Sequence, residues 1–196
     1  MTGTGRLIRL ILRRDRWLLL VWMLWLVLIA SSLSTTYQDQ YSTAADRAEY
    51  ANTSGTNPTF LALYGPLQDS GAGGIISQRL GAVPIFIALV SVLTVIRHTR
   101  TEEQAGRREL LSAGVCGRHS ALAAAVSVTM VANLVVGLLI GATLRQDLPG
   151  SGSLILGLGF AAVGCVFAAV GALAAQVTEN AGTARGIAIG SLGHSC

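Results

Sequence analysis

The stretch Ser120–Leu144, SALAAAVSVTMVANLVVGLLIGATL, decides the fold, because it runs for 25 residues without a charged side chain. A helix of this length covers about 37 Å, more than the ~30 Å hydrocarbon core of a bilayer. Three further stretches are also free of charge: Trp17–Leu33, Leu80–Ile96 and Leu154–Ala175. Because backbone polar groups inside a bilayer must be satisfied within their own segment, we expect four membrane-spanning helices. The sequence predicts an all-α integral membrane protein.

The composition of the 196 residues agrees with this prediction, since 52% are hydrophobic and only 12% are charged. Soluble globular domains carry about 25% charged residues, so an ordinary cytosolic enzyme is excluded. All 14 basic residues are arginine, and a P-loop ATPase needs a lysine in its Walker A loop, so that class is excluded too. The net charge is +4, and the charged residues lie between the apolar runs. We therefore expect the lipid bilayer as a partner, and no nucleic acid.

The placement of the arginines predicts the orientation of the chain. Eleven lie on one side of the predicted spans: Arg6, Arg9, Arg13, Arg14, Arg16, Arg97, Arg100, Arg107, Arg108, Arg118 and Arg185. Only Arg47, Arg79 and Arg145 lie on the other. This asymmetry predicts a cytoplasmic N-terminus. Arginine-only usage with abundant Ala, Gly and Val is typical of a GC-rich bacterial genome, so we expect a multi-pass protein of a bacterial plasma membrane.

The first span also has features of a secretory signal, with an arginine-rich start and small residues at its end. Its apolar core is long and holds three tryptophans, which favours a retained span. The polar segment 34–74 follows as an external connection. Its first half, through about Ala51, lacks Gly and Pro and is expected to extend the first helix outward. We expect Arg79, at the outer end of the second span, to reach the outer headgroups.

The third and fourth spans are rich in small residues that allow close helix packing. The residues expected at such contacts are Gly137, Gly141, Gly157 and Gly164. A substrate-facing surface is the alternative function of this stripe. Asn133 is the one amide side chain within these two spans, and we expect it to form an interhelical hydrogen bond rather than to line a polar path.

Residues 97–119 between the second and third spans form a cytoplasmic loop with a dense polar pattern. Thr101-Glu102-Glu103-Gln104 fits a capping box at the start of a helix. Leu110 and Leu111 add a modest apolar face, which predicts a short helix along the inner membrane surface. Composition alone leaves two functions open: a solvated connecting loop, or a docking helix for a cytoplasmic partner.

The run Arg100–Leu111, RTEEQAGRRELL, followed by Gly114-Val115 and Gly117-Arg118, resembles the corresponding loop of bacterial type-2 ABC permeases. More narrowly, it is similar to actinobacterial exporters of polyketide antibiotics, the tetronasin-type group. Thr43–Arg47, Leu63–Pro66 and Thr183–Gly186 are similar to the same group.

The resemblance implies that the loop supplies a coupling helix, which seats in a groove of a separate ATP-binding cassette subunit. The implied contact residues are Glu102, Glu103, Gln104, Arg107, Arg108 and Glu109. The arginine-rich N-terminal stretch would correspond to an interfacial helix before the first span. The implied function is that of the permease subunit of an exporter for hydrophobic small molecules such as polyketide antibiotics.

Exporters of this group have more spans than four, and the run Gly186–Cys196 stops where a fifth span would begin. We therefore expect an N-terminal part of a permease transmembrane domain, with a truncated fifth helix. A non-transporting accessory or scaffold subunit of the membrane is the alternative function.

An enzyme is not expected, because the four predicted spans contain no Asp, Glu, His or Arg. Intramembrane proton relays and metal sites normally show such residues. The three histidines, His98, His119 and His194, have no neighbouring carboxylate or cysteine in the sequence that suggests a site. We expect no metal and no cofactor.

Overall fold

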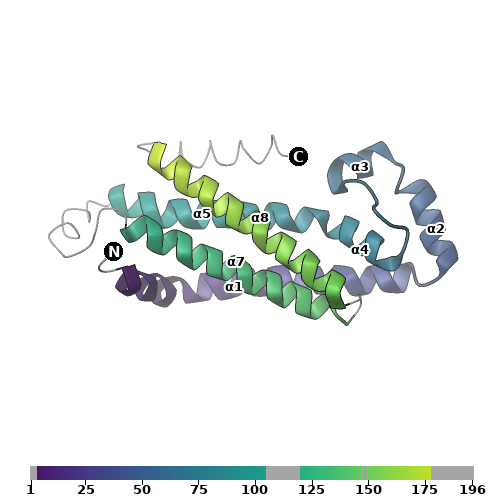
Figure 1. Cartoon of the computed structure of the whole chain (residues 1–196), viewed down its shortest axis with the longest axis horizontal. Coiled ribbons are helices and arrows are strands. Elements are labelled where there is room, and N and C mark those ends of the chain that lie inside the picture. Colours follow the sequence, from purple (N-terminus) through teal and green to yellow (C-terminus); the bar gives the residue numbers. More distant parts are fainter. Residues whose placement is uncertain (1–3, 105–119, 147, 149, 178–196) are drawn as a thin grey trace.

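The computed structural model describes residues 4–104, 120–146, 148 and 150–177, and its regular elements there are all helical (Figure 1). The elements are α1 (Thr4–Gln40), α2 (Ala44–Thr53), α3 (Pro58–Tyr64), α4 (Ala72–Arg79), the 3-10 turn η1 (Leu80–Ala82), α5 (Val83–Gln104), α7 (Ser120–Leu144) and α8 (Gly150–Val177). The predicted all-helical class is confirmed over these residues.

Four helical stretches are long and apolar enough to cross a membrane: Leu7–Gln40, Ala72–Thr99, Leu122–Leu144 and Gly150–Gln176. Three of them contain a predicted span, and Leu122–Leu144 covers all but the first two residues of the predicted span Ser120–Leu144. The run Gly186–Cys196, where a fifth span is expected, lies outside the described residues. The cytoplasmic location of the N-terminus stays a prediction.

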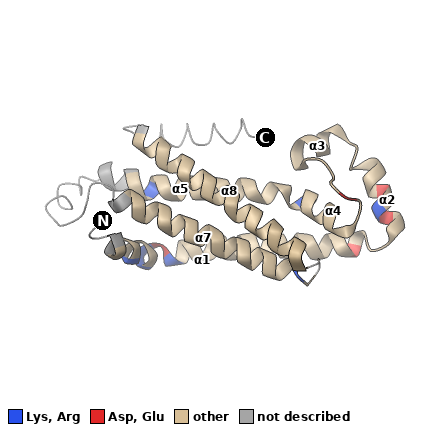
Figure 2. Cartoon of the chain, viewed as in Figure 1, with Lys and Arg blue, Asp and Glu red and all other residues tan. Residues whose placement is uncertain are grey.

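The long helices lie lengthwise beside one another in an antiparallel bundle (Figure 1). α7 lies at the centre of the packing and contacts α8, α1 and α5, and α5 also packs against α8. One end of the bundle, where α1 and α7 begin and α5 and α8 end, is called the loop end below. α2 and α3 lie at the opposite end. Charged side chains of the described residues are found toward these two ends, while the middle is uncharged (Figure 2).

The main core cluster fills the middle of the bundle, with contributions from each of the long helices. It consists of Leu26, Ala30, Ile76, Leu80, Val83, Ile87, Val136, Ile140, Leu144 and Phe160. Large apolar side chains also point outward, for example Leu24 at 60%, Val131 at 62% and Ile155 at 71% exposure. Such an outer surface is costly in water and suits the hydrocarbon of a bilayer.

The expected outward extension of the first helix is confirmed as far as Gln40 but is wrong through Ala51, because α1 ends at Gln40 and a new helix, α2, begins at Ala44. A reciprocal capping box between the two helices explains the break. The Thr43 hydroxyl accepts from the Asp46 backbone N–H (3.2 Å), and the Asp46 carboxylate accepts from the Thr43 N–H (3.1 Å). Two orphan donors are thereby satisfied, which favours a new helix start over continuation.

The helix around the second predicted span begins at Ala72, ahead of the Leu80 expected from the charge-free run. It reaches α5 through the 3-10 turn η1, which ends two residues before Pro84. Proline has no N–H, and in an α-helix its ring clashes with the carbonyl four residues earlier. The tighter turn at Leu80–Ala82 relieves that clash.

Candidate functional site

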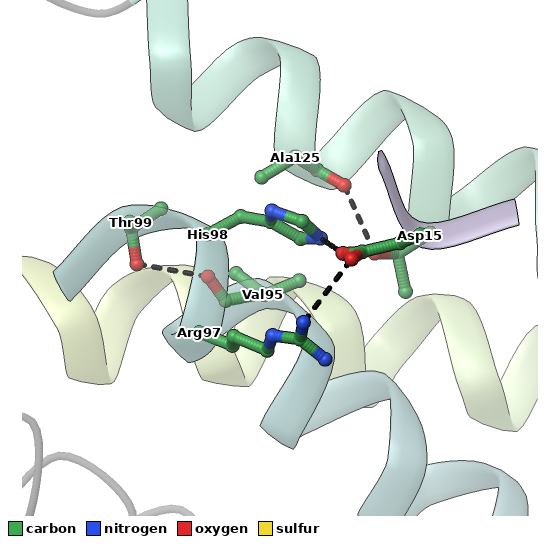
Figure 3. A network of polar contacts seen from close by, with 7 residues as sticks. Asp15, Val95, Arg97, His98, Thr99 and Ala125 are labelled. Carbon is green, nitrogen blue, oxygen red and sulfur yellow. Dashed lines mark hydrogen bonds and ion pairs between the residues drawn. The ribbon is translucent and has the colours of Figure 1, made fainter. Parts of the chain in front are cut away.

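A buried ionic cluster joins α1 to α5 at the loop end of the bundle (Figure 3). The Asp15 side chain is only 3% exposed. Its Oδ1 lies 3.1 Å from Nη2 of Arg97, and its Oδ2 lies 2.7 Å from Nε2 of His98. A carboxylate removed from water needs such compensation, because an unpaired buried charge is strongly destabilising.

The position of Asp15 follows from the pattern of α1. Ile11, Asp15 and Leu19 recur every four residues and therefore share one face, which is buried. The two apolar residues of this face pack against Ala124 and Val128 of α7. Small alanines let the helices approach closely, and the carboxylate between the two apolar side chains is held against α5.

Nearby hydroxyls are satisfied within their own helices. The hydroxyl of Thr99 donates to the carbonyl of Val95 at 2.9 Å (Figure 3). The hydroxyl of Thr129 donates to the carbonyl of Ala125, also at 2.9 Å. The contact between His98 and Asp15 Oδ2 is short but not aligned as a hydrogen bond. The cluster therefore sets a fixed cation and a titratable imidazole against one carboxylate.

The carboxylate that contacts His98 is not one of its neighbours in the sequence. Sequence reasoning missed the contact because Asp15 belongs to a helix more than 80 residues earlier in the chain. A usable signal exists: Asp15 is the sole acidic residue among the first 38, and it falls on the Ile11–Leu19 face. No group of three metal-ligating side chains occurs within the described part of the chain.

The residues expected to contact an ATP-binding subunit lie at or beyond the end of α5. Glu102, Glu103 and Gln104 form its last turn, while Arg107, Arg108 and Glu109 lie outside the described residues. The predicted capping box at Thr101 is wrong, because α5 runs through this residue without a break. No Gly or Pro interrupts residues 85–105, so nothing in the sequence ends the helix there.

The glycines expected at helix contacts lie along the packing of α7 against α8. A Cβ atom added to Gly157 would lie 2.2 Å from the carbonyl oxygen of Gly137, and one on Gly137 would lie 2.4 Å from that of Gly157. On Gly141 it would lie 3.1 Å from the Ser153 carbonyl oxygen. At the first pair the two backbones are so close that no side chain fits between them.

Asn133 forms the predicted interhelical hydrogen bond. Its side-chain amide donates to the Ser91 hydroxyl across 2.9 Å and so joins α7 to α5. The residue is 0% exposed. Gly164 of α8 covers it, since a Cβ there would lie 2.5 Å from the Asn133 side chain.

At the opposite end of the bundle an aromatic box encloses Arg79. Its guanidinium carbon lies 5.0 Å from the ring centroids of Tyr37 and Tyr50, 4.6 Å from that of Phe60 and 5.5 Å from that of Tyr64. Each ring face attracts a cation. The Arg79 guanidinium thus packs among aromatic rings of the protein, and its reach to the outer headgroups stays a prediction.

Hydrogen bonds complete the aromatic box. The Tyr50 hydroxyl donates to Oε1 of Gln78 (2.8 Å), whose Nε2 donates to the Gly65 carbonyl (2.7 Å). Gly65 has φ +80°, a left-handed conformation that favours glycine, and it ends α3. Burial raises the pKa of Tyr50, partly offset by the charge of Arg79. The box thus ties α1, α2, α3 and α4 together.

Comparison with known proteins gives one relative over nearly the whole chain. It is the multidrug efflux system permease protein Rv1217c of Mycobacterium tuberculosis, 38% identical over 199 aligned positions. The alignment covers 98% of this chain but only 35% of the relative, so the chain spans about a third of that protein's length. No protein-family model matches the chain. With its four apolar helices, the chain is a multi-pass membrane protein similar to one part of a multidrug efflux permease.

Proposed function

We propose that the chain forms membrane-spanning helices of an ABC exporter for hydrophobic compounds, of which polyketide antibiotics are one class. A separate ATP-binding subunit drives the transport. The observation that carries the proposal is the 38% identity, over 98% of the chain, to a protein named a multidrug efflux permease. The uncharged middle of the bundle supports a hydrophobic rather than an ionic substrate.

The end of α5 is the proposed route of coupling. Glu102, Glu103 and Gln104 lie in the last turn of the helix that holds Arg97 and His98. A push by the ATP-binding subunit on this turn moves α5 as a unit, because the helix is continuous. The contacts of Arg97 and His98 with Asp15 then pass the displacement to α1. ATP binding shifts the balance between two arrangements of the bundle only if it favours one of them.

The test is ATPase activity of the tagged full chain together with the subunits that copurify from membranes of its own host. In vesicles, we expect a hydrophobic compound to stimulate vanadate-sensitive ATP hydrolysis. The double variant Glu102→Ala/Glu103→Ala should lower this stimulation severalfold at equal protein content. The control variant Glu49→Ala changes an exposed acidic residue of α2 and should leave it unchanged.

Two outcomes argue against the proposal. If the chain copurifies with no ATPase activity, an accessory or scaffold function takes its place. If the double variant stimulates normally while the complex is active, the route through the end of α5 is wrong, although the transport function stands.

A further inference from the structure

Three arginines form a stripe on the outer face of α1. Arg9, Arg13 and Arg16 are all exposed, and their spacing of four and three residues places them on one side of the helix. The guanidinium carbon of Arg16 lies 5.5 Å from the ring centroid of Trp17, which is 68% exposed. We call Arg9, Arg13 and Arg16 the arginine stripe.

The arginine stripe continues directly into an apolar surface. Leu20 and Leu24 lie one and two turns after Arg16 on nearly the same face, and they are 53% and 60% exposed. The opposite face of α1, with Ile11 and Leu19, is buried against α7. The outer face thus changes from cationic to apolar within one helical turn, as a surface does when it passes from headgroups into hydrocarbon.

No acidic side chain offsets the charge of the stripe among the side chains described in residues 5–99, 121–146 and 150–176. Asp15, the sole acid among the first 38 residues, points to the other side of α1 and is paired with Arg97 and His98. The ion pairs found in the described chain include neither Arg9 nor Arg13. Among the side chains that the structure describes, these three adjacent cations therefore face outward without an acidic partner.

We propose that the arginine stripe binds the phosphate groups of anionic phospholipids, with the acyl chains lying along Trp17, Leu20 and Leu24. Arginine forms charge-assisted hydrogen bonds to phosphate oxygens, often two at once. A water-soluble protein or a nucleic acid would meet the cations but not the apolar surface one turn away. The proposal does not depend on the transport function or on which leaflet the stripe occupies.

Fluorescence quenching by brominated lipids tests the proposal, because Trp17 lies beside the stripe. The full chain with Trp22→Phe and Trp25→Phe retains Trp17 as its single tryptophan. It is reconstituted in vesicles that mix phosphatidylglycerol with phosphatidylcholine, with one lipid brominated at a time. We expect phosphatidylglycerol to bind about fivefold more strongly than phosphatidylcholine. This factor corresponds to about one favourable contact between an arginine and an anionic headgroup.

Matched variants separate the stripe from general charge. Arg13→Gln should lower the preference for phosphatidylglycerol, and the triple variant at Arg9, Arg13 and Arg16 should bring the ratio close to one. Arg145→Gln removes the same charge from an exposed position between α7 and α8 and should leave the ratio unchanged. In the single-tryptophan chain with the arginine stripe intact, raising NaCl from about 0.1 M to 1 M should weaken the preference, since the screening length falls from ~10 Å to ~3 Å.

Equal quenching by the two lipids in the unsubstituted stripe would overturn the proposal. So would a preference that persists in a folded triple variant. If millimolar inorganic phosphate abolishes the preference, the site binds a soluble anion and the assignment to lipid headgroups is wrong. The salt dependence is measured without any substitution in the arginine stripe. It therefore tests the proposal even if the triple variant fails to fold.

Discussion

A single methyl group at Gly157 should separate α7 from α8. In Gly157→Ala, the new Cβ would lie 2.2 Å from the Gly137 carbonyl oxygen and 2.9 Å from the backbone nitrogen of Gly141. Real Cβ atoms stay beyond 3.0 Å, so the helices must move apart by about 0.8 Å. Backbone atoms cannot swing aside as a flexible side chain does. The matched control is Gly159→Ala, because a Cβ at Gly159 meets nothing within 4 Å.

The size of the destabilisation by Gly157→Ala follows from the separation that it forces between α7 and α8. A separation of about 0.5–1 Å removes about a quarter to a half of the van der Waals attraction between two contacting atoms, and each such atom pair contributes about 0.1–0.2 kcal/mol. With roughly 20 pairs around the crossing, the loss is about 0.5–2 kcal/mol, to which overpacking strain adds. Replacing glycine by alanine gains about 0.8–1 kcal/mol of helix propensity at either position. We expect Gly157→Ala to be net destabilising by about 1–2 kcal/mol and Gly159→Ala to be stabilising by up to about 1 kcal/mol.

The assay is thermal unfolding in detergent, with both variants and the unsubstituted chain measured at one scan rate. The prediction is opposite shifts of the midpoint for two identical substitutions two residues apart on one helix. If Gly157→Ala raises the midpoint as much as Gly159→Ala does, the close contact of the two backbones does not stabilise the bundle, and the packing argument fails.

Three further substitutions test the polar contacts. Asp15→Asn should destabilise the fold by about 2 kcal/mol. This is less than the ~3–5 kcal/mol usual for breaking a buried ion pair, because the arginine partner is 41% exposed. In thermal unfolding, the stability lost through Asp15→Asn should be smaller when His98→Gln is already present. Ser91→Ala should cost about 1–2 kcal/mol, since it leaves the buried amide of Asn133 without its partner; a midpoint unchanged within error contradicts this. Burial raises the pKa of Tyr50 in the folded state. Its contribution to stability is therefore complete below the ordinary tyrosine pKa of about 10 and is lost as the pH rises through the higher folded pKa. Tyr50→Phe should remove this alkaline loss of stability in a pH series of unfolding midpoints.

Local pattern was enough to predict the long helices. A charge-free run such as Ser120–Leu144 has only one way to satisfy its backbone in lipid, and the structure contains it as a single helix. Asn133 was predictable for a related reason, because an amide in an apolar helix needs a partner from a neighbouring helix. These inferences require knowledge of one segment at a time.

The ionic and aromatic clusters could not be predicted in the same way. A rule that ends a span at a charge places Arg79 outside, whereas rings from three other helices enclose it. The partner of His98 lies on α1, and the choice of that helix depends on how α1, α5 and α7 pack. Pairings of this kind depend on how each helix is rotated about its own axis. When a helix is apolar on all sides, its sequence pattern says little about that rotation.

The length of α1 has a mechanical consequence. Asp15 ties the helix to α5 near one end, and Tyr37 ties it to Arg79 near the other, about 33 Å away at 1.5 Å per residue. Because no break occurs between the two residues, α1 is one continuous rod with a contact of this kind near each end. A rigid tilt of α1 by about 10° around Asp15 would displace the Tyr37 end by about 6 Å, roughly the width of one aromatic ring. A tilt of that size would separate the Tyr37 ring from the Arg79 guanidinium.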